Sequence, residues 1–170
     1  MSSANSLLGR AGDLQARAAS LTAPFALLAL RIALAIPFFR SGLTKWDGLN
    51  LSTGARYLFT EEFKLHFFWG SMAYPAPILM AHLAAIGEIV LPILLILGLA
   101  TRPAALGILA MTVIIQLTIP DGLINFHLPW FAMALALFAY GGGLFSADRL
   151  LAPLLGRAPH SAATPTSRLA

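Results

Sequence analysis

Two charged residues lie inside stretches of the chain that are otherwise apolar. Arg31 lies in the segment PFALLALRIALAIPFF, and Glu88 lies in PILMAHLAAIGEIVLPILLILGLA. A charged side chain at the centre of a bilayer costs roughly 2.5–3.5 kcal/mol on insertion scales, so such residues usually face a bundle interior and pair. At about 1.5 Å per residue, their depths in two adjacent spans differ by about 6 Å. An arginine side chain bridges that difference, so the sequence predicts that Arg31 and Glu88 pair.

Two interpretations of this predicted pair stay open. It is either a structural ion pair that fixes the packing of two adjacent helices, or a polar site for a quinone headgroup, an anion or a proton. Removing one partner of a buried pair leaves an uncompensated charge, which is strongly destabilising. The predicted pairing therefore implies that Glu88→Ala alone reduces the amount of folded protein, because Arg31 loses its partner.

Lys45 and Gln116 complete the predicted buried polar site. Lys45 belongs to a stripe at near-helical spacing that also holds Arg31 and Gly42, and this stripe should face the bundle interior. Gln116 stands four residues after Thr112 on a third apolar stretch, so the two share one helix face. We expect Gln116 to be buried and to hydrogen-bond another helix.

Three histidines are weak candidates for metal ligands, namely His66, His82 and His127. Histidine together with methionine can bind copper, and two facing histidines can hold haem. Tight ligand spacing such as HxxxH is not present among them. The simpler interpretation is that they lie at the membrane interface and hydrogen-bond loop backbone, and we expect no metal site.

The composition is that of a membrane protein. Hydrophobic residues make up 58% of the chain and charged residues 11%, whereas a soluble domain carries about 25% charged residues. The formal net charge is +4, but the basic residues are thinly spread and form no patch for nucleic acid. The chain contains no cysteine, which excludes thiol–disulfide exchange and a thiolate zinc or iron–sulfur site made by this chain alone.

Hydropathy and proline positions predict an all-α membrane protein with four transmembrane helices. The expected spans are 24–44, 77–99, 103–119 and 129–140, within a membrane domain over 23–151. Residues 1–22 are expected to form a flexible tail or a short interfacial helix, and residues 152–170 a disordered tail.

The connecting segments differ in kind. The long segment between the first two spans has helix-compatible spacing over about 53–68, which predicts an interfacial helix with aromatic side chains in the aromatic belt. The segment PDGLINFHL is expected to be a loop between the third and fourth spans. Gly141–Gly143, Ser146 and Asp148 predict a helix stop followed by a cap.

Basic residues predict the orientation. With four spans both termini share one side of the membrane, and that side carries the larger basic set: Arg10, Arg17, Arg102, Arg149, Arg157 and Arg168. The opposite side carries Lys45, Arg56 and Lys64. This bias favours cytoplasmic termini and an inner-membrane location in a bacterial cell.

Several of these segments together resemble the DoxX family of small bacterial membrane proteins. They are RIALAIPFFRSGLTKWDG, GEIVLPILLILGLATRPAALGILAMTVIIQL and GGGLFSADRLL. The resemblance implies a four-helix membrane bundle. It also implies a place in a membrane redox system, since some members are the small subunit of a thiosulfate:quinone oxidoreductase and others accompany oxidant-defence complexes.

The resemblance therefore predicts an accessory subunit of a membrane redox system, with a quinone as its expected redox partner. A recognisable cofactor motif is not present, so electrons would have to pass through a bound quinone or a partner. Whether the subunit is itself catalytic stays open. One alternative is a non-catalytic scaffold or assembly partner; another is a carrier of small solutes or ions. The expected partners are the lipid bilayer and either another protein or further copies of this chain.

Overall fold

The computed structural model describes residues 2–154, without the side chains of residues 2–8 and 11. Four helical segments in this part of the chain are long and apolar enough to cross a membrane. They are Gly12–Leu43, Pro77–Leu97, Thr101–Thr118 and Pro120–Tyr140. The prediction of an all-α membrane protein with four spans is confirmed, and the protein is a multi-pass membrane protein.

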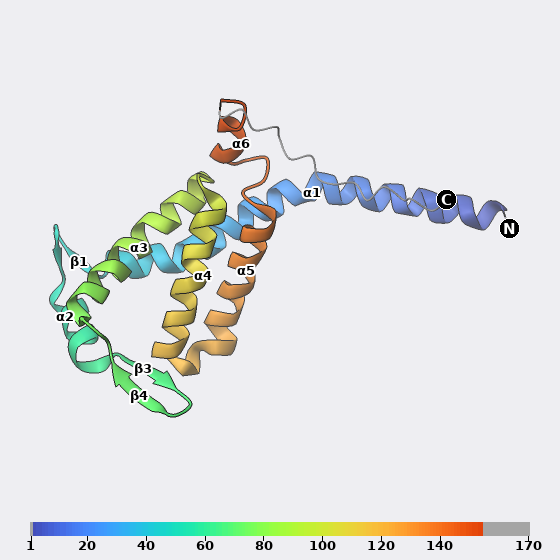
Figure 1. Cartoon of the computed structure of the whole chain (residues 1–170). Helices are drawn as coiled ribbons and strands as arrows, with labels where there is room; N and C mark the ends of the chain where they lie inside the picture. The colour runs from blue at the N-terminus through green and yellow to red at the C-terminus, as the bar shows by residue number, and fades with distance from the viewer. Residues whose placement is uncertain (1, 155–170) are drawn as a thin grey trace.

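The first span belongs to one long helix, α1 (Ser2–Leu43). Its N-terminal part projects away from the bundle (Figure 1). Residues 2–22, expected to be a flexible tail or a short interfacial helix, form the first turns of this same helix. The segment is rich in alanine and leucine, which favour helix, and the helix continues through Pro24 and Pro37. The predicted C-terminal tail lies almost wholly outside the described residues.

A tight turn joins α3 (Pro77–Leu97) to α4 (Thr101–Thr118). Gly98 ends α3 with a φ of 68°, a left-handed conformation that glycine adopts without steric cost. Ala100 also has a positive φ, 49°, and precedes the first residue of α4. The predicted ends of these two spans agree with the structure to within two residues.

The fourth span is longer than predicted. The segment expected to be a loop folds as the 3₁₀ turn η2 (Pro120–Gly122) and the π-helical turn η3 (Leu123–His127), which lead directly into α5 (Leu128–Tyr140). The loop prediction was wrong because turn residues occupy only the start of this segment, and apolar residues follow them. Helix α5 ends at Gly141, which has a φ of 76°, and the short helix α6 (Ala147–Leu151) follows.

The segment between α1 and α3 is part helix and part hairpin. Its elements are β1 (Trp46–Asp47), β2 (Asn50–Leu51), α2 (Thr53–Tyr57), η1 (Leu58–Glu62), β3 (Lys64–Phe67) and β4 (Gly70–Ala73). The predicted helix begins where expected, with Ser52 as its N-cap, but ends at Glu62. The remainder of the predicted helix is wrong, because β3 and β4 pair as an antiparallel hairpin there.

Packing of α1 against α3 is the most extensive contact of the bundle, and α4 against α5 is the next (Figure 1). Gly42 lies directly on the backbone of α3, where an added Cβ would lie 2.9 Å from the carbonyl carbon and oxygen of Glu88. The close approach of the two helices places Gly42 level with Glu88.

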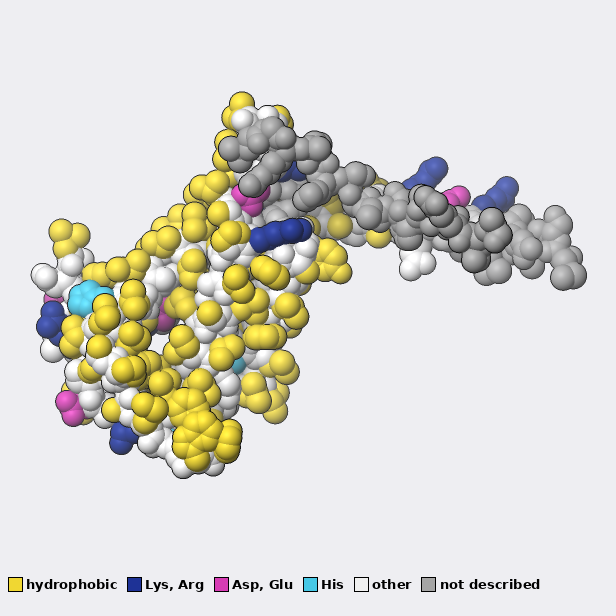
Figure 2. Space-filling model, in the orientation of Figure 1, with side chains coloured by type: hydrophobic (Ala, Val, Ile, Leu, Met, Phe, Trp, Pro, Cys, Tyr) yellow, Lys and Arg dark blue, Asp and Glu magenta, His cyan; other side chains and the backbone are white. Residues whose placement is uncertain are grey.

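The outer faces of the four spans are apolar and exposed, as lipid contact requires (Figure 2).

Candidate functional site

Arg31 and Glu88 do not pair. The Arg31 guanidinium donates to the carbonyl oxygen of Phe145 over 2.5 Å and lies 3.5 Å from that of Leu95. Glu88 instead accepts from the ammonium group of Lys45 over 2.5 Å. The predicted pair was wrong because Arg31 lies 11 residues, about 16 Å, along α1 from Gly42, which is the residue level with Glu88.

Arg31 joins three segments at one end of the bundle. It is fully buried, and its Nη1 fills the space beside Gly98, where an added Cβ would overlap it. Its bond to Phe145 holds the segment between α5 and α6 against α1. Its hydrogen-bond partners are main-chain carbonyls of this joint, so its hydrogen bonds link α1 to the end of α3 and to the segment after α5.

Asp148 strengthens the same joint from the other side. Its carboxylate accepts from the backbone N–H groups of Ala100 (2.6 Å) and Thr101 (2.8 Å), and its own N–H donates to Gly98. These bonds satisfy otherwise free donors at the start of α4. The Ser146 side chain caps α6 by accepting from the backbone N–H of Arg149. The predicted helix stop and cap after Tyr140 are therefore confirmed. The cap that Asp148 provides for α4 was not predicted.

Asp148→Ala should lower the free energy of unfolding by about 1 kcal/mol, the usual effect of removing an N-cap side chain. Asp148→Asn keeps one acceptor oxygen and should lower it less. Melting temperatures of the three proteins in the same detergent test this order. Equal losses for the alanine and asparagine variants would show that the acceptor bonds are not the cause.

Lys45 and Glu88 lie on the wall of a pocket of about 900 Å³. Their side chains are 12% and 6% exposed, and Lys45 also donates to the Ser41 hydroxyl over 3.0 Å. The predicted inward stripe on α1 is confirmed, since Arg31 and Gly42 are buried and Lys45 is nearly so. A buried ion pair on a mostly apolar wall is the kind of group that can orient a ligand.

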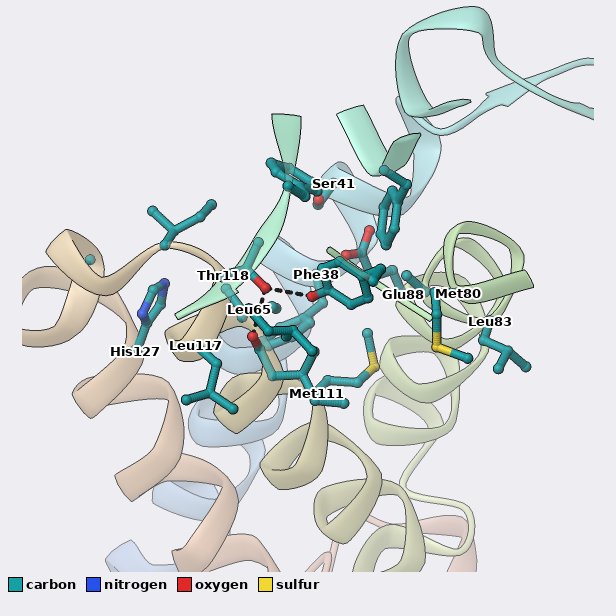
Figure 3. Close-up of a pocket in the computed structure, with 18 of the residues that line it drawn as sticks. Phe38, Ser41, Leu65, Met80, Leu83, Glu88, Met111, Leu117, Thr118 and His127 are labelled. Carbon is teal, nitrogen blue, oxygen red and sulfur yellow. Dashed lines mark hydrogen bonds between the residues drawn. The ribbon is translucent and has the colours of Figure 1, made fainter. Parts of the chain in front are cut away.

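The pocket is enclosed by several elements and is mostly apolar. Its walls come from α1, α3, α4, η1, the β3–β4 region, η2, η3 and the start of α5 (Figure 3). On the side near the hairpin, the Tyr74 hydroxyl bonds that of Thr118 over 2.5 Å. Asp121 and His127 are further polar lining residues. The sequence analysis did not predict Tyr74, Thr118 or Ser41 as lining residues. Ser41 alone carried a signal, because it stands four residues before Lys45 and so shares its helix face.

The three histidines lie apart and make separate hydrogen bonds. The Nδ1 atom of His66 lies 3.1 Å from Leu117 O, and that of His82 lies 2.8 Å from Ile78 O. His127 is buried, and its Nδ1 lies 2.6 Å from the Gln116 side-chain oxygen. Among residues 2–154, no three His, Cys, Asp or Glu side chains gather as a metal site would require.

Gln116 was predicted to share a polar site with Lys45 and Glu88, but it does not line the pocket that holds them. It is partly buried, and its amide donates to Pro120 O over 3.0 Å while its oxygen bonds His127. The expected bond to another helical segment is present, because His127 lies in η3. Gln116 orients His127, which itself lines the pocket.

Tyr74 should make the stability of the folded protein depend on pH in the alkaline range. Burial raises the pKa of Tyr74 above its ordinary value of about 10, and the bond with Thr118 opposes this in part. The folded state therefore holds this proton more tightly than the unfolded state, so stability should fall as the pH rises above about 10. Tyr74→Phe should flatten that fall in melting temperature above about pH 10. An unchanged slope would assign the fall to other groups.

Four membrane-spanning helices that enclose a pocket with a buried ion pair define a small multi-pass membrane protein. The chain belongs to the DoxX family, whose model matches residues 26–121. It is also similar to an uncharacterized protein of Haemophilus influenzae, with 32% identity over 136 residues, which covers 74% of this chain and 82% of that protein. No solved structure matches the chain.

Proposed function

We propose that this protein is an accessory subunit of a membrane redox system and that it binds a quinone headgroup beside Lys45 and Glu88. The buried ion pair on the wall of the apolar pocket carries this proposal. Quinone carbonyl oxygens are hydrogen-bond acceptors, and the ammonium of Lys45 and the hydroxyl of Ser41 are donors. A bound quinone would supply the electron-carrying chemistry that the side chains lack.

The size and charge of the pocket support this ligand. Its volume of about 900 Å³ lies in the range of small-molecule sites, roughly 300–1,000 Å³. The Lys and Glu charges cancel as a pair, and Asp121 adds a further negative charge to the lining. A neutral headgroup fits these charges better than an anion, which Glu88 and Asp121 would repel.

The proposal includes the orientation of the protein in the membrane. The excess of arginine on the side of the termini favours cytoplasmic termini in a bacterial inner membrane. The hairpin and the pocket would then lie toward the outer side. Glu88 lies 11 residues after Pro77, about 16 Å along α3, so the headgroup would sit well below the outer surface.

A second candidate function is a non-catalytic scaffold, which the projecting part of α1 favours. This part carries Arg10, Arg17 and the exposed Leu14 and Leu21 beyond the bundle (Figure 1). A helix with such exposed groups could hold a soluble partner at the membrane. A stoichiometric partner that co-purifies with a quinone-free protein would favour the scaffold.

Quinone content of protein extracted in native lipid nanodiscs tests the proposal. The wild type should retain quinone, and the double variant Lys45→Met/Glu88→Met should retain about tenfold less, as expected for losing a hydrogen bond from a charged donor. The double variant leaves no unpaired charge, and its melting temperature reports whether it is folded. Equal quinone content in both folded proteins would refute the site.

The matched control is the double variant Glu61→Gln/Lys64→Met. Both residues are exposed and lie in the segment between α1 and α3, but neither lines the pocket. This control should retain as much quinone as the wild type. A similar loss in the control would assign the effect to changed lipid association of the whole protein.

A further inference from the structure

We infer that the quinone reaches the pocket sideways from the bilayer, through an opening between α3 and α4, and that the site takes quinones with a long hydrocarbon tail. This inference rests on the proposed quinone site. We call the opening the portal and define it by Leu83 of α3 and Ile114 of α4. Both residues line the pocket and are also exposed on the outside of the bundle, by 55% and 47%.

The closest contacts seen at the glycines of α3 and α4 lie away from the hairpin. An added Cβ at Gly107 would lie 2.9 Å from Leu91, and one at Gly87 would lie 3.1 Å from the sulfur of Met111. Toward the hairpin the two helices diverge (Figure 1). Acidic atoms are visible at the bottom of a hollow on this face in Figure 2. The portal therefore lies where the two helices no longer touch.

Contacts close the pocket on the α1 side and on the hairpin side. Phe38, only 2% exposed, forms the wall on α1, and Trp130 packs against it with ring centroids 5.1 Å apart. On the hairpin side, β3 is joined to the end of α4 through His66 and Leu117 O. The Tyr74–Thr118 bond adds a second connection beside it. A path into the pocket from that side would have to separate these contacts.

The side chains near the portal suit a flexible apolar tail. Met80 and Met111 line the pocket beside Leu83, on the same side as Glu88 (Figure 3). Methionine is unbranched and polarizable, so it adapts to a ligand of irregular shape. Leu83 lies five residues before Glu88, about 7.5 Å along α3. A headgroup at Glu88 would therefore direct its tail through the portal into the hydrocarbon of the bilayer.

Closing the portal chemically tests the inference, because the chain contains no cysteine of its own. The double variant Leu83→Cys/Ile114→Cys is bridged in nanodiscs with the shortest bis-methanethiosulfonate reagent that joins both thiols, as verified by mass spectrometry. Bridging should slow uptake of an added long-tailed quinone by about tenfold or more, since a gated step then limits binding. Bridging after loading should trap the quinone, and a reductant should reverse both effects.

The single variants treated with the same reagent are the controls, and they should take up quinone at nearly the wild-type rate. A tail-less quinone analogue should bind the unbridged protein about tenfold more weakly, since it forgoes apolar burial. Unchanged uptake in the bridged protein would overturn the portal and leave the quinone site standing. A phospholipid trapped in place of quinone, or no quinone binding by the unbridged protein, would overturn the inference together with the proposed function.

Discussion

Arg31→Met is expected to lower the free energy of unfolding by about 3 kcal/mol, although the side chain lies far from the pocket. A hydrogen bond from a charged donor contributes roughly 1.5–3 kcal/mol, and the substitution removes the one that the Phe145 carbonyl accepts. The main loss is the 2.5 Å bond to Phe145, which connects α1 to the segment after α5. Methionine keeps an apolar side chain of similar length, so a cavity adds little to the loss.

Denaturant titration of the purified protein in mixed micelles measures this loss. Arg40→Met makes the same change at an exposed position of the same helix and should alter stability by less than about 0.5 kcal/mol. The folded fraction of Arg31→Met should still bind quinone, because Arg31 does not line the pocket. Equal losses for the two variants would show that the buried bonds of Arg31 contribute no net stability.

The fold could be predicted from the sequence because the spans carry strong local signals. Runs of apolar residues that begin at Pro77 and near Pro103 and Pro129 mark the helices, and the structure has helices at these places. The hairpin after Glu62 was missed because its aromatic residues also match helical spacing. Tertiary contacts with α4, such as that of His66 with Leu117, stabilise the strand pairing, and they are not visible in a local pattern.

The site could be predicted only in part. The cost of a buried charge correctly indicated that Arg31 and Glu88 are buried, and helical spacing correctly placed Lys45 on the inward face. The partners could not be assigned, because sequence gives the approximate depth of a residue but not the register of two helices. The close contact of Gly42 with Glu88 sets that register. Arg31 binds main-chain carbonyls, which every residue carries, so no side-chain pattern indicates them.

Glu88→Ala is expected to be at least as destabilising as any substitution on the pocket wall, by roughly 3–5 kcal/mol, because it leaves the Lys45 ammonium buried without its counter-charge. The remaining contact of Lys45 is the Ser41 hydroxyl, which is neutral. Lys45→Met should also destabilise the protein, since it leaves Glu88 without a partner. Unfolding titrations of both single variants measure these losses.

The double variant Lys45→Met/Glu88→Met separates the ion pair from the packing around it. Replacing a buried pair by apolar residues of similar volume is often neutral or stabilising, so the double variant should be more stable than either single variant. Additive losses would mean that the two charges do not interact in the folded protein. If the double variant is as stable as the wild type yet retains no quinone, then stability cannot be the reason for the pair, and ligand binding remains as its role.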